Sequence, residues 1–268
     1  MIIFSHANGF GAGTYRRLIE GWRTIGEEVR AVESYGHDRN HPIGRNWWGM
    51  THQLLELIDN TGDSRIWLVG HSMGGYLSLI AGGQRPNRVR GIVLLDSPVI
   101  SGWRSGAVAL TKAVGQMYRV SPAAVAATRR DHWASIEDAH RHFLEKKVFA
   151  AWHPEVLRSY IETGTEPDPA DPTGSSRRLT FHRNIEAEIY ATVPHWLIPY
   201  LRRNPLGGPV AFIGGRHSDV IRQAGLNATR RITHGRISSM AGSHLFPLEH
   251  PDETVQEVLN WISKLEAI

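Results

Sequence analysis

Short apolar segments alternate with segments of helical periodicity along the first hundred residues. The apolar segments have the length of buried strands and lie at Ile2–Ser5, Glu28–Val32, Arg65–Val69 and Gly91–Leu95. The segments between them fit helices, at Thr14–Trp22, Trp47–Ile58 and Gly75–Gly82. Strands that alternate with helices at this spacing predict a mostly parallel sheet with helices on both faces, hence an α/β fold.

The alternation stops after the fourth strand and resumes near the end of the chain. Residues 101–204 are mostly helical in pattern and rich in Trp, His and Tyr. Further strands are expected at Pro209–Ile213 and Arg236–Met240, and a final helix begins at Pro251. We therefore expect an α/β core formed by residues 1–100 and 205–268, with a helical cap or lid inserted at residues 101–204.

Composition narrows the classes of protein that this chain can represent. Its 268 residues are 41% hydrophobic and 21% charged, as in an ordinary globular enzyme. No run of eighteen apolar residues and no secretion signal is present, so we expect a cytoplasmic protein that does not span a membrane. The absence of cysteine excludes disulfides, thiolate metal sites and a cysteine nucleophile.

Charge and histidine content point to no macromolecular partner or cofactor. The formal net charge is +4, but the arginines are spread along the whole chain and no nucleic-acid-binding motif accompanies them. The 15 histidines include no pair with metal-ligand spacing and an accompanying carboxylate. We therefore expect no nucleic acid, no metal and no cofactor. The sequence carries no signal of the oligomeric state.

The stretch Gly70-His71-Ser72-Met73-Gly74 is the strongest sign of chemistry in the chain. It joins an expected strand to an expected helix, and a serine at such a sharp turn needs small residues two positions to either side. Gly70 and Gly74 meet that requirement. The pattern predicts that Ser72 is a nucleophile, which needs an imidazole to take its proton and a carboxylate to orient that imidazole.

Two loops late in the chain offer these partners. Asp219 follows the strand at Pro209–Ile213, and His244 follows the last expected strand. Asp96 also ends a strand and is the alternative carboxylate, although Asp219 fits the motif better. His234 and His250 are rivals of His244, while His6 and His71 flank the site and read as structural or pocket-lining residues.

Four motifs together resemble the α/β-hydrolase superfamily, in the branch with an inserted helical cap. They are His6-Ala-Asn-Gly-Phe10, the turn at Ser72, the segment ending at Asp219, and the run from His244 to Pro251. The resemblance implies a Ser72–His244–Asp219 triad and a sheet of about six strands that lacks the family's leading hairpin. It also implies an oxyanion hole formed by the backbone N–H groups of Met73 and Asn8, with Phe10 as the alternative to Asn8.

The function expected on this basis is that of a serine hydrolase of the carboxylesterase or lipase-like kind. Its substrate would be a small to medium, largely apolar carboxylic ester, which is cleaved through an acyl-enzyme. The same triad also serves C–C bond hydrolases, lactonases, thioesterases, acyltransferases and cofactor-free perhydrolases, and the sequence does not separate them. A non-catalytic ligand receptor on the same fold is a further alternative. No substrate-binding residue is singled out, because the aromatic residues of the cap could line either its core or the pocket.

Overall fold

The computed structural model describes residues 1–62 and 65–268. Its central sheet has six parallel strands in the order β2-β1-β3-β4-β8-β9. The strands are β1 (Ile2–Ser5), β2 (Val29–Ala31), β3 (Ile66–His71), β4 (Val89–Leu95), β8 (Val210–Gly215) and β9 (Ile237–Met240). The predicted α/β fold with about six strands is confirmed.

Helices cover both faces of this sheet. One layer contains α1 (Arg16–Thr24) and α15 (Pro251–Glu266), which pack on each other, and the other contains α2 (Trp48–Asp59) and α3 (Met73–Gln84). Each face of the sheet packs on its helices in a hydrophobic core. Alternate residues of a strand belong to the two cores, because successive side chains of a strand point to opposite faces. Ile2 and Phe4 join the α1–α15 core, whereas Ile3 joins the α2–α3 core. The continuous apolar strands of the sequence are the consequence of this two-sided burial.

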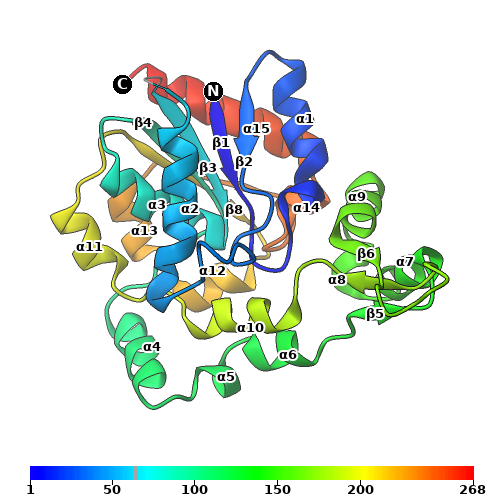
Figure 1. Ribbon diagram of the computed structural model, residues 1–268. Coiled ribbons are helices and arrows are strands. Elements are labelled where there is room, and N and C mark those ends of the chain that lie inside the picture. The colour runs from blue at the N-terminus through cyan, green and yellow to red at the C-terminus, as the bar shows by residue number, and fades with distance from the viewer. Residues whose placement is uncertain (63–64) are drawn as a thin grey trace.

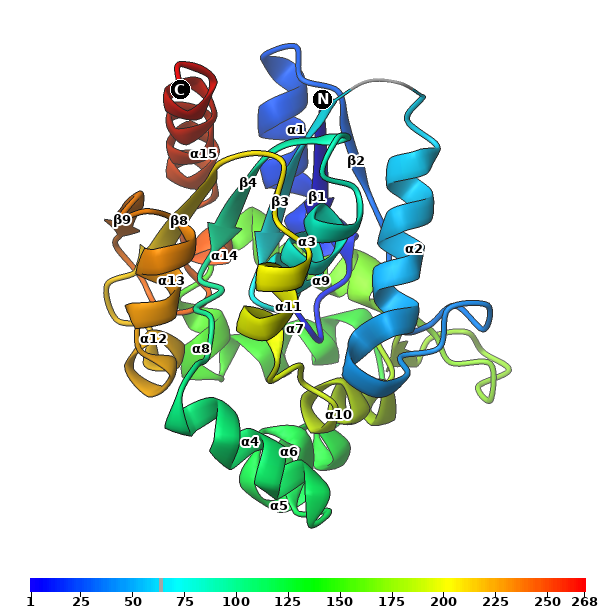
Figure 2. The same cartoon turned by 90° about the vertical axis from the view of Figure 1, so that its left-hand side faces the viewer.

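A long, mainly helical region lies between β4 and β8. Its helices are α4 (Trp103–Ala113), α5 (Met117–Val120), α6 (Ala123–Thr128), α7 (Ile136–Leu144), α8 (Lys147–Ala150), α9 (Pro154–Gly164), α10 (Arg183–Ala191) and α11 (Leu197–Arg203). Figure 2 shows α4, α5 and α6 beyond the carboxyl ends of the central strands, at the end of the molecule opposite both termini. The division into core and cap at residues 101 and 204 stays a prediction.

The inserted region also contains strands that the sequence pattern did not indicate. β5 (His132–Trp133), β6 (Thr165–Pro167) and β7 (Arg177–Leu179) form a small antiparallel sheet in the order β5-β7-β6. A cluster of aromatic side chains packs beside it, in which Phe149 and Tyr160 contact each other and both contact Phe143 and Trp152. At least these aromatic residues of the cap therefore belong to its core.

Short helices complete the chain. They are η1 (Ala12–Tyr15), η2 (Arg45–Trp47), α12 (Asp219–Ala224), α13 (Asn227–Ile232) and α14 (Phe246–Glu249). No helix in the described part of the chain combines the length and the apolar character that a membrane span requires.

Candidate active site

The order of the strands creates a crevice at the carboxyl ends of the neighbouring strands β1 and β3. The chain runs from β1 outward to β2 and then returns to β3 on the other side of β1. The loops that follow β1 and β3 therefore diverge, and ligands of open α/β sheets bind at such a switch point. Asn8 lies on the first of these loops, and Ser72 directly follows β3.

The backbone holds Ser72 in a strained conformation. Its φ of 52° and ψ of −113° lie outside the regions that non-glycine residues normally adopt. The turn is possible because its neighbours lack side chains: a Cβ at Gly70 would collide with the backbone of Gly74, and a Cβ at Gly74 would collide with the Ser5 carbonyl. The hydroxyl of Ser97, which follows β4, donates to the Ser72 carbonyl at 2.8 Å and so stabilises the turn.

Three side chains form a hydrogen-bonded series at the end of the sheet. His244 Nε2 lies 3.0 Å from Ser72 Oγ, and His244 Nδ1 lies 2.6 Å from Asp96 Oδ2. Asp96 is fully buried, while His244 is 22% exposed in its side chain. In this arrangement the Nδ1–H group donates to the carboxylate, and Nε2 is free to accept a proton from the serine. The geometry is that of an activated serine nucleophile.

The structure places Asp96, and not the expected Asp219, beside His244. The Asp219 side chain is 66% exposed and pairs with Arg222, one turn further along α12, and it forms no contact with His244 among the interactions of the described residues. The reason lies in where β8 ends and α12 begins. Ser218 is the N-cap of α12 and its hydroxyl accepts from the Ile221 N–H, so Asp219 falls in the first turn of the helix and faces solvent.

Asp96 is held by the loop on which the acid was expected. The Gly215 N–H donates to Asp96 Oδ1 at 2.7 Å, and the Ser218 hydroxyl donates to Oδ2 at 2.5 Å. These two bonds satisfy a carboxylate that has no access to water. The role of Ser218 was missed in the sequence, where it is simply the residue before an aspartate.

The loop after β1 and the start of α3 each supply one residue that lines the cavity. Asn8 and Met73 both line it, and within the described residues neither backbone N–H has a hydrogen-bond acceptor. The N–H group of Phe10, the other candidate, instead donates to the Ala7 carbonyl at 3.3 Å. The Asn8 side chain is anchored by its own bond, from Nδ2 to the Glu186 carbonyl at 3.0 Å.

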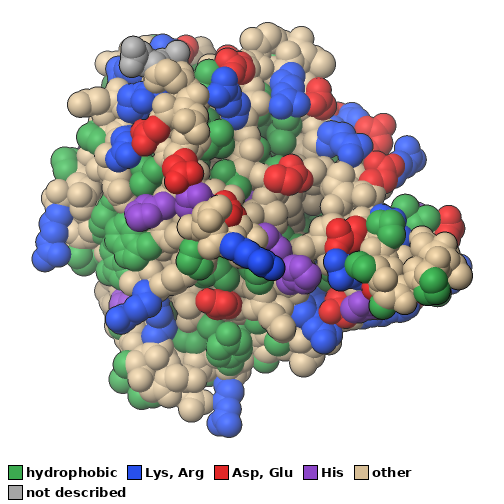
Figure 3. All heavy atoms as spheres, viewed as in Figure 1, with side chains coloured by type: hydrophobic (Ala, Val, Ile, Leu, Met, Phe, Trp, Pro, Cys, Tyr) green, Lys and Arg blue, Asp and Glu red, His purple; other side chains and the backbone are tan. Residues whose placement is uncertain are grey.

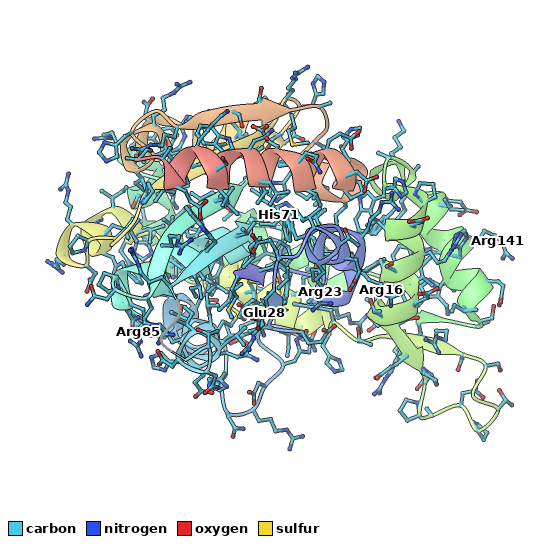
Figure 4. The ribbon with its side chains drawn as sticks, turned by 90° about the horizontal axis from the view of Figure 1, so that it is seen from above. Arg16, Arg23, Glu28, His71, Arg85 and Arg141 are labelled. Carbon is cyan, nitrogen blue, oxygen red and sulfur yellow. The ribbon has the colours of Figure 1, made fainter. Side chains whose placement is uncertain are left out.

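A buried relay connects this loop to His244. The Ala7 N–H donates to the Tyr15 oxygen, the Tyr15 hydroxyl donates to His71 Nδ1 at 2.7 Å, and His71 Nε2–H donates to the His244 carbonyl at 2.9 Å. Burial, with a smaller effect of the nearby His244 ring, holds the pKa of His71 well below its usual range. His71 is thus neutral, as both of its bonds require. Figure 4 shows it in the interior, whereas Arg85 and Arg141 lie at the edges.

The relay gives His71 a definite structural role. Its neighbour Ser72 and its hydrogen-bond partner His244 belong to the same site, so His71 couples the positions of the two. The sequence indicated a structural or pocket-lining histidine but offered no sign of Tyr15, which is 56 residues away.

The cavity beside Ser72 has a volume of about 390 Å³ and a mainly apolar lining. Its walls come from the core and from the inserted region, and they include Trp47, Tyr76, Ile100, Val108, Ile189 and Val193. The polar groups in the lining are few. Within the described residues, no group of three His, Asp or Glu side chains is arranged to hold a metal ion.

Comparison with known proteins shows the family to which the chain belongs. Residues 2–257 match the model of the alpha/beta hydrolase family, so the chain belongs to that family. A Mycobacterium phage D29 protein described as "Putative non-heme haloperoxidase" is 30% identical over 265 residues, which cover 94% of this chain and 83% of that protein. A monoglyceride lipase of Rattus norvegicus is 27% identical over 107 residues, 37% of this chain and 35% of the lipase.

Solved structures share the fold at low sequence identity. The crystal structure of E-2-(acetamidomethylene)succinate hydrolase superposes with a TM-score of 0.72 at 20% identity, covering 98% of this chain and 91% of that one. An esterase of M. tuberculosis superposes with a TM-score of 0.68 at 17% identity, covering 98% and 84% of the two chains. At these identities the likeness concerns the fold alone.

Proposed function

We propose that this protein hydrolyses small to medium carboxylic esters with a largely apolar acyl group, through a covalent acyl-enzyme. The observation that carries the proposal is the series Ser72 Oγ–His244 Nε2 and His244 Nδ1–Asp96 Oδ2, at 3.0 and 2.6 Å. The apolar cavity of about 390 Å³ beside Ser72 supports an apolar acyl group of limited size.

In the first half of the reaction Ser72 Oγ attacks the ester carbonyl carbon while its proton passes to His244 Nε2. The carbonyl oxygen gains the negative charge and accepts hydrogen bonds from the Met73 and Asn8 N–H groups. Both residues line the cavity, and neither N–H has an acceptor within the described residues, which supports this role. The bond between the carbonyl carbon and the alkoxy oxygen then breaks. His244 returns the proton to the leaving alcohol, and Ser72 carries the acyl group.

Water completes the cycle by the same steps. His244 Nε2 takes a proton from water, whose oxygen attacks the acyl carbon, and the bond from that carbon to Ser72 Oγ breaks as the proton returns to Oγ. Asp96 keeps Nδ1 protonated throughout and stabilises the imidazolium that forms twice in each turnover. Because Gly215 and Ser218 already bind the carboxylate, Asp96 is fixed before substrate arrives.

A panel of p-nitrophenyl esters from acetate to laurate, with a lactone and a thioester alongside, tests this function. We expect turnover of esters with a maximum at short to medium chain length, and a loss of about 10⁴-fold or more in kcat for Ser72→Ala. Ser175→Ala, which removes an exposed hydroxyl far along the chain, serves as the matched control and should keep full activity. Turnover of the lactone or thioester alone would refute the ester specificity, and ester turnover that survives in Ser72→Ala would refute the nucleophile.

A further inference from the structure

Helix α4 presents its apolar side to solvent. None of its residues is buried, and Trp103, Leu110 and the following Val114 are 75%, 66% and 57% exposed. The exposed positions recur three or four residues apart and therefore form one face of the helix. Each is apolar or glycine: Trp103, Gly106, Ala107, Leu110, Ala113 and Val114.

The polar side of α4 faces the protein. The Ser105 hydroxyl donates to the His195 carbonyl. Lys112 Nζ donates to Asn46 Oδ1 at 2.7 Å and to the Val193 carbonyl at 3.1 Å. An ordinary surface helix has the opposite orientation, with its apolar stripe on the core. The inward bonds of Ser105 and Lys112 thus fix a helix whose apolar face has no partner within the chain.

The exposed apolar area continues over α5 and α6. Six of the twelve large hydrophobic side chains that are exposed in the described residues lie in this one segment. They are Trp103, Leu110, Val114, Tyr118, Val120 and Val125, here named the cap surface. A concentration of this kind marks an interaction site rather than the scattered apolar residues of a normal surface.

The charge around the cap surface selects the kind of partner. Residues 97–128 contain no acidic residue and three basic ones, of which Lys112 points inward, so that Arg104 and Arg119 supply the charge at the cap surface. The neighbouring helix α10 adds one exposed carboxylate, that of Glu188. The Arg104 guanidinium lies 4.8 Å from the centre of the Trp103 ring, so a cation and an indole occur side by side. Figure 3 shows hydrophobic and basic side chains at the end of the molecule that carries α4 and α5, with an acidic side chain just above them. A helix with an exposed apolar face, a tryptophan and basic neighbours is suited to the surface of an anionic bilayer.

The same charges disfavour a second copy of this chain as the partner. A two-fold interface would bring the cap surface against itself, and its arginines would then meet arginines with no carboxylate of residues 97–128 to pair with. The position of the cavity also fits a lipid surface. Ala107 and Val120 belong to the exposed apolar area and also line the cavity beside Ser72, so the cavity opens at this surface.

We propose that the cap surface docks on anionic lipid bilayers, with the apolar face of α4 inserted at the level of the headgroups. The proposal goes beyond the hydrolytic function and does not depend on it, because binding is measured without turnover. It does not involve a membrane span.

Co-sedimentation of the full chain with vesicles tests the proposal. We expect binding to vesicles of phosphatidylcholine with phosphatidylglycerol, and binding at least about tenfold weaker to phosphatidylcholine alone. The variant Leu110→Glu/Val114→Glu should lower the affinity for the anionic vesicles about tenfold or more, since it places charge on the inserting face. Ile25→Glu is the matched control, because Ile25 is 54% exposed but lies after α1, and it should bind like the wild type.

Two further measurements distinguish this proposal from misfolding and from the proposed function. Leu110 and Val114 do not line the cavity, so the double variant should keep the wild-type rate with a water-soluble ester. Ser72→Ala should bind vesicles like the wild type. A wild-type protein that sediments with the vesicles but turns over no ester would refute only the hydrolytic function. The docking proposal is overturned if the protein does not sediment with anionic vesicles, if it binds both vesicle types equally, or if the double variant binds like Ile25→Glu. A solution dimer that the double variant dissociates would also overturn it.

Discussion

His6 is a buried histidine whose protonation state is fixed by its hydrogen-bond partners. Its Nε2 accepts the Tyr35 N–H at 3.0 Å, so the proton must lie on Nδ1, which donates to the Ala7 carbonyl at 2.8 Å. Burial lowers the pKa of His6 to about 4. Protonation of Nε2 would break the hydrogen bond from the Tyr35 N–H to His6. It would thereby disturb Ala7, which is bonded to His6 and precedes Asn8. A neutral His6 is therefore a condition for the geometry of the loop after β1.

This histidine makes the stability of the fold depend on pH. Between pH 6.5 and 4 the unfolded chain binds a proton at His6 and the folded chain does not, so the free energy of unfolding must fall as the pH falls. The loss from His6 amounts to about 3 kcal/mol over this range, and His71 acts in the same direction. We expect urea unfolding midpoints to drop between pH 6.5 and 4.5.

His6→Asn isolates this effect, because an amide keeps an acceptor for the Tyr35 N–H but has no titrating ring. Its stability should fall less steeply over the same pH range than that of the wild type. Equal slopes for the two proteins, or an NMR titration in which the His6 ring of the folded protein protonates near pH 6.5, would show that the account of His6 is wrong.

The turn between β3 and α3 is the element on which the site depends most. It is built from contacts that leave no room for side chains: Gly70 faces Gly74, and Gly74 faces the Ser5 carbonyl of the neighbouring strand. The strain at Ser72 persists because β1, β4 and α3 surround the turn. The serine is thereby raised out of the sheet into the cavity.

Gly74→Ala tests the packing of this turn. The added methyl group would overlap the Ser5 carbonyl, and we expect the free energy of unfolding to fall by about 3 kcal/mol. Gly106→Ala is the control in another helix, because a Cβ there meets no atom and alanine favours a helix. It should leave stability unchanged or raise it by up to about 1 kcal/mol. A urea midpoint of Gly74→Ala equal to that of the wild type would contradict the packing described here.

Among the helices, strands and turns, the sequence predicts those that a local pattern of residues determines. Strands β3 and β4 were predicted because most of their residues are apolar and buried between the two helical layers. The turn at Ser72 was predicted because only glycines fit beside it. The sequence favoured Asp219 over Asp96 as the partner of His244, and only the start of α12 at Ser218 turns Asp219 toward solvent and leaves His244 to Asp96. Strands β5, β6 and β7 are two or three residues long, too short to give a periodic signal.

Across the whole molecule, the site joins segments that are far apart in the sequence. Ser72 follows β3, Asp96 follows β4, and His244 follows β9. The groups that hold Asp96 lie at the end of β8 and just after it. Because the strands are parallel, these four loops meet at the carboxyl ends of the strands, and α4, α5 and α6 lie beyond those ends (Figure 1). The parallel sheet thus determines which residues meet, while the inserted region shapes the cavity and carries the cap surface.

The central claim is that Ser72 is activated through His244 by Asp96. Its most direct test is the rate at which a fluorophosphonate probe labels the intact protein, followed by mass spectrometry. In this reaction Ser72 Oγ displaces fluoride from phosphorus and His244 takes the serine proton. We expect a single adduct on Ser72, formed at the wild-type rate in Asp219→Asn and at least about a hundredfold more slowly in Asp96→Asn. The claim would be contradicted by wild-type labelling in Asp96→Asn with slow labelling in Asp219→Asn, or by a folded wild-type protein in which Ser72 is not labelled.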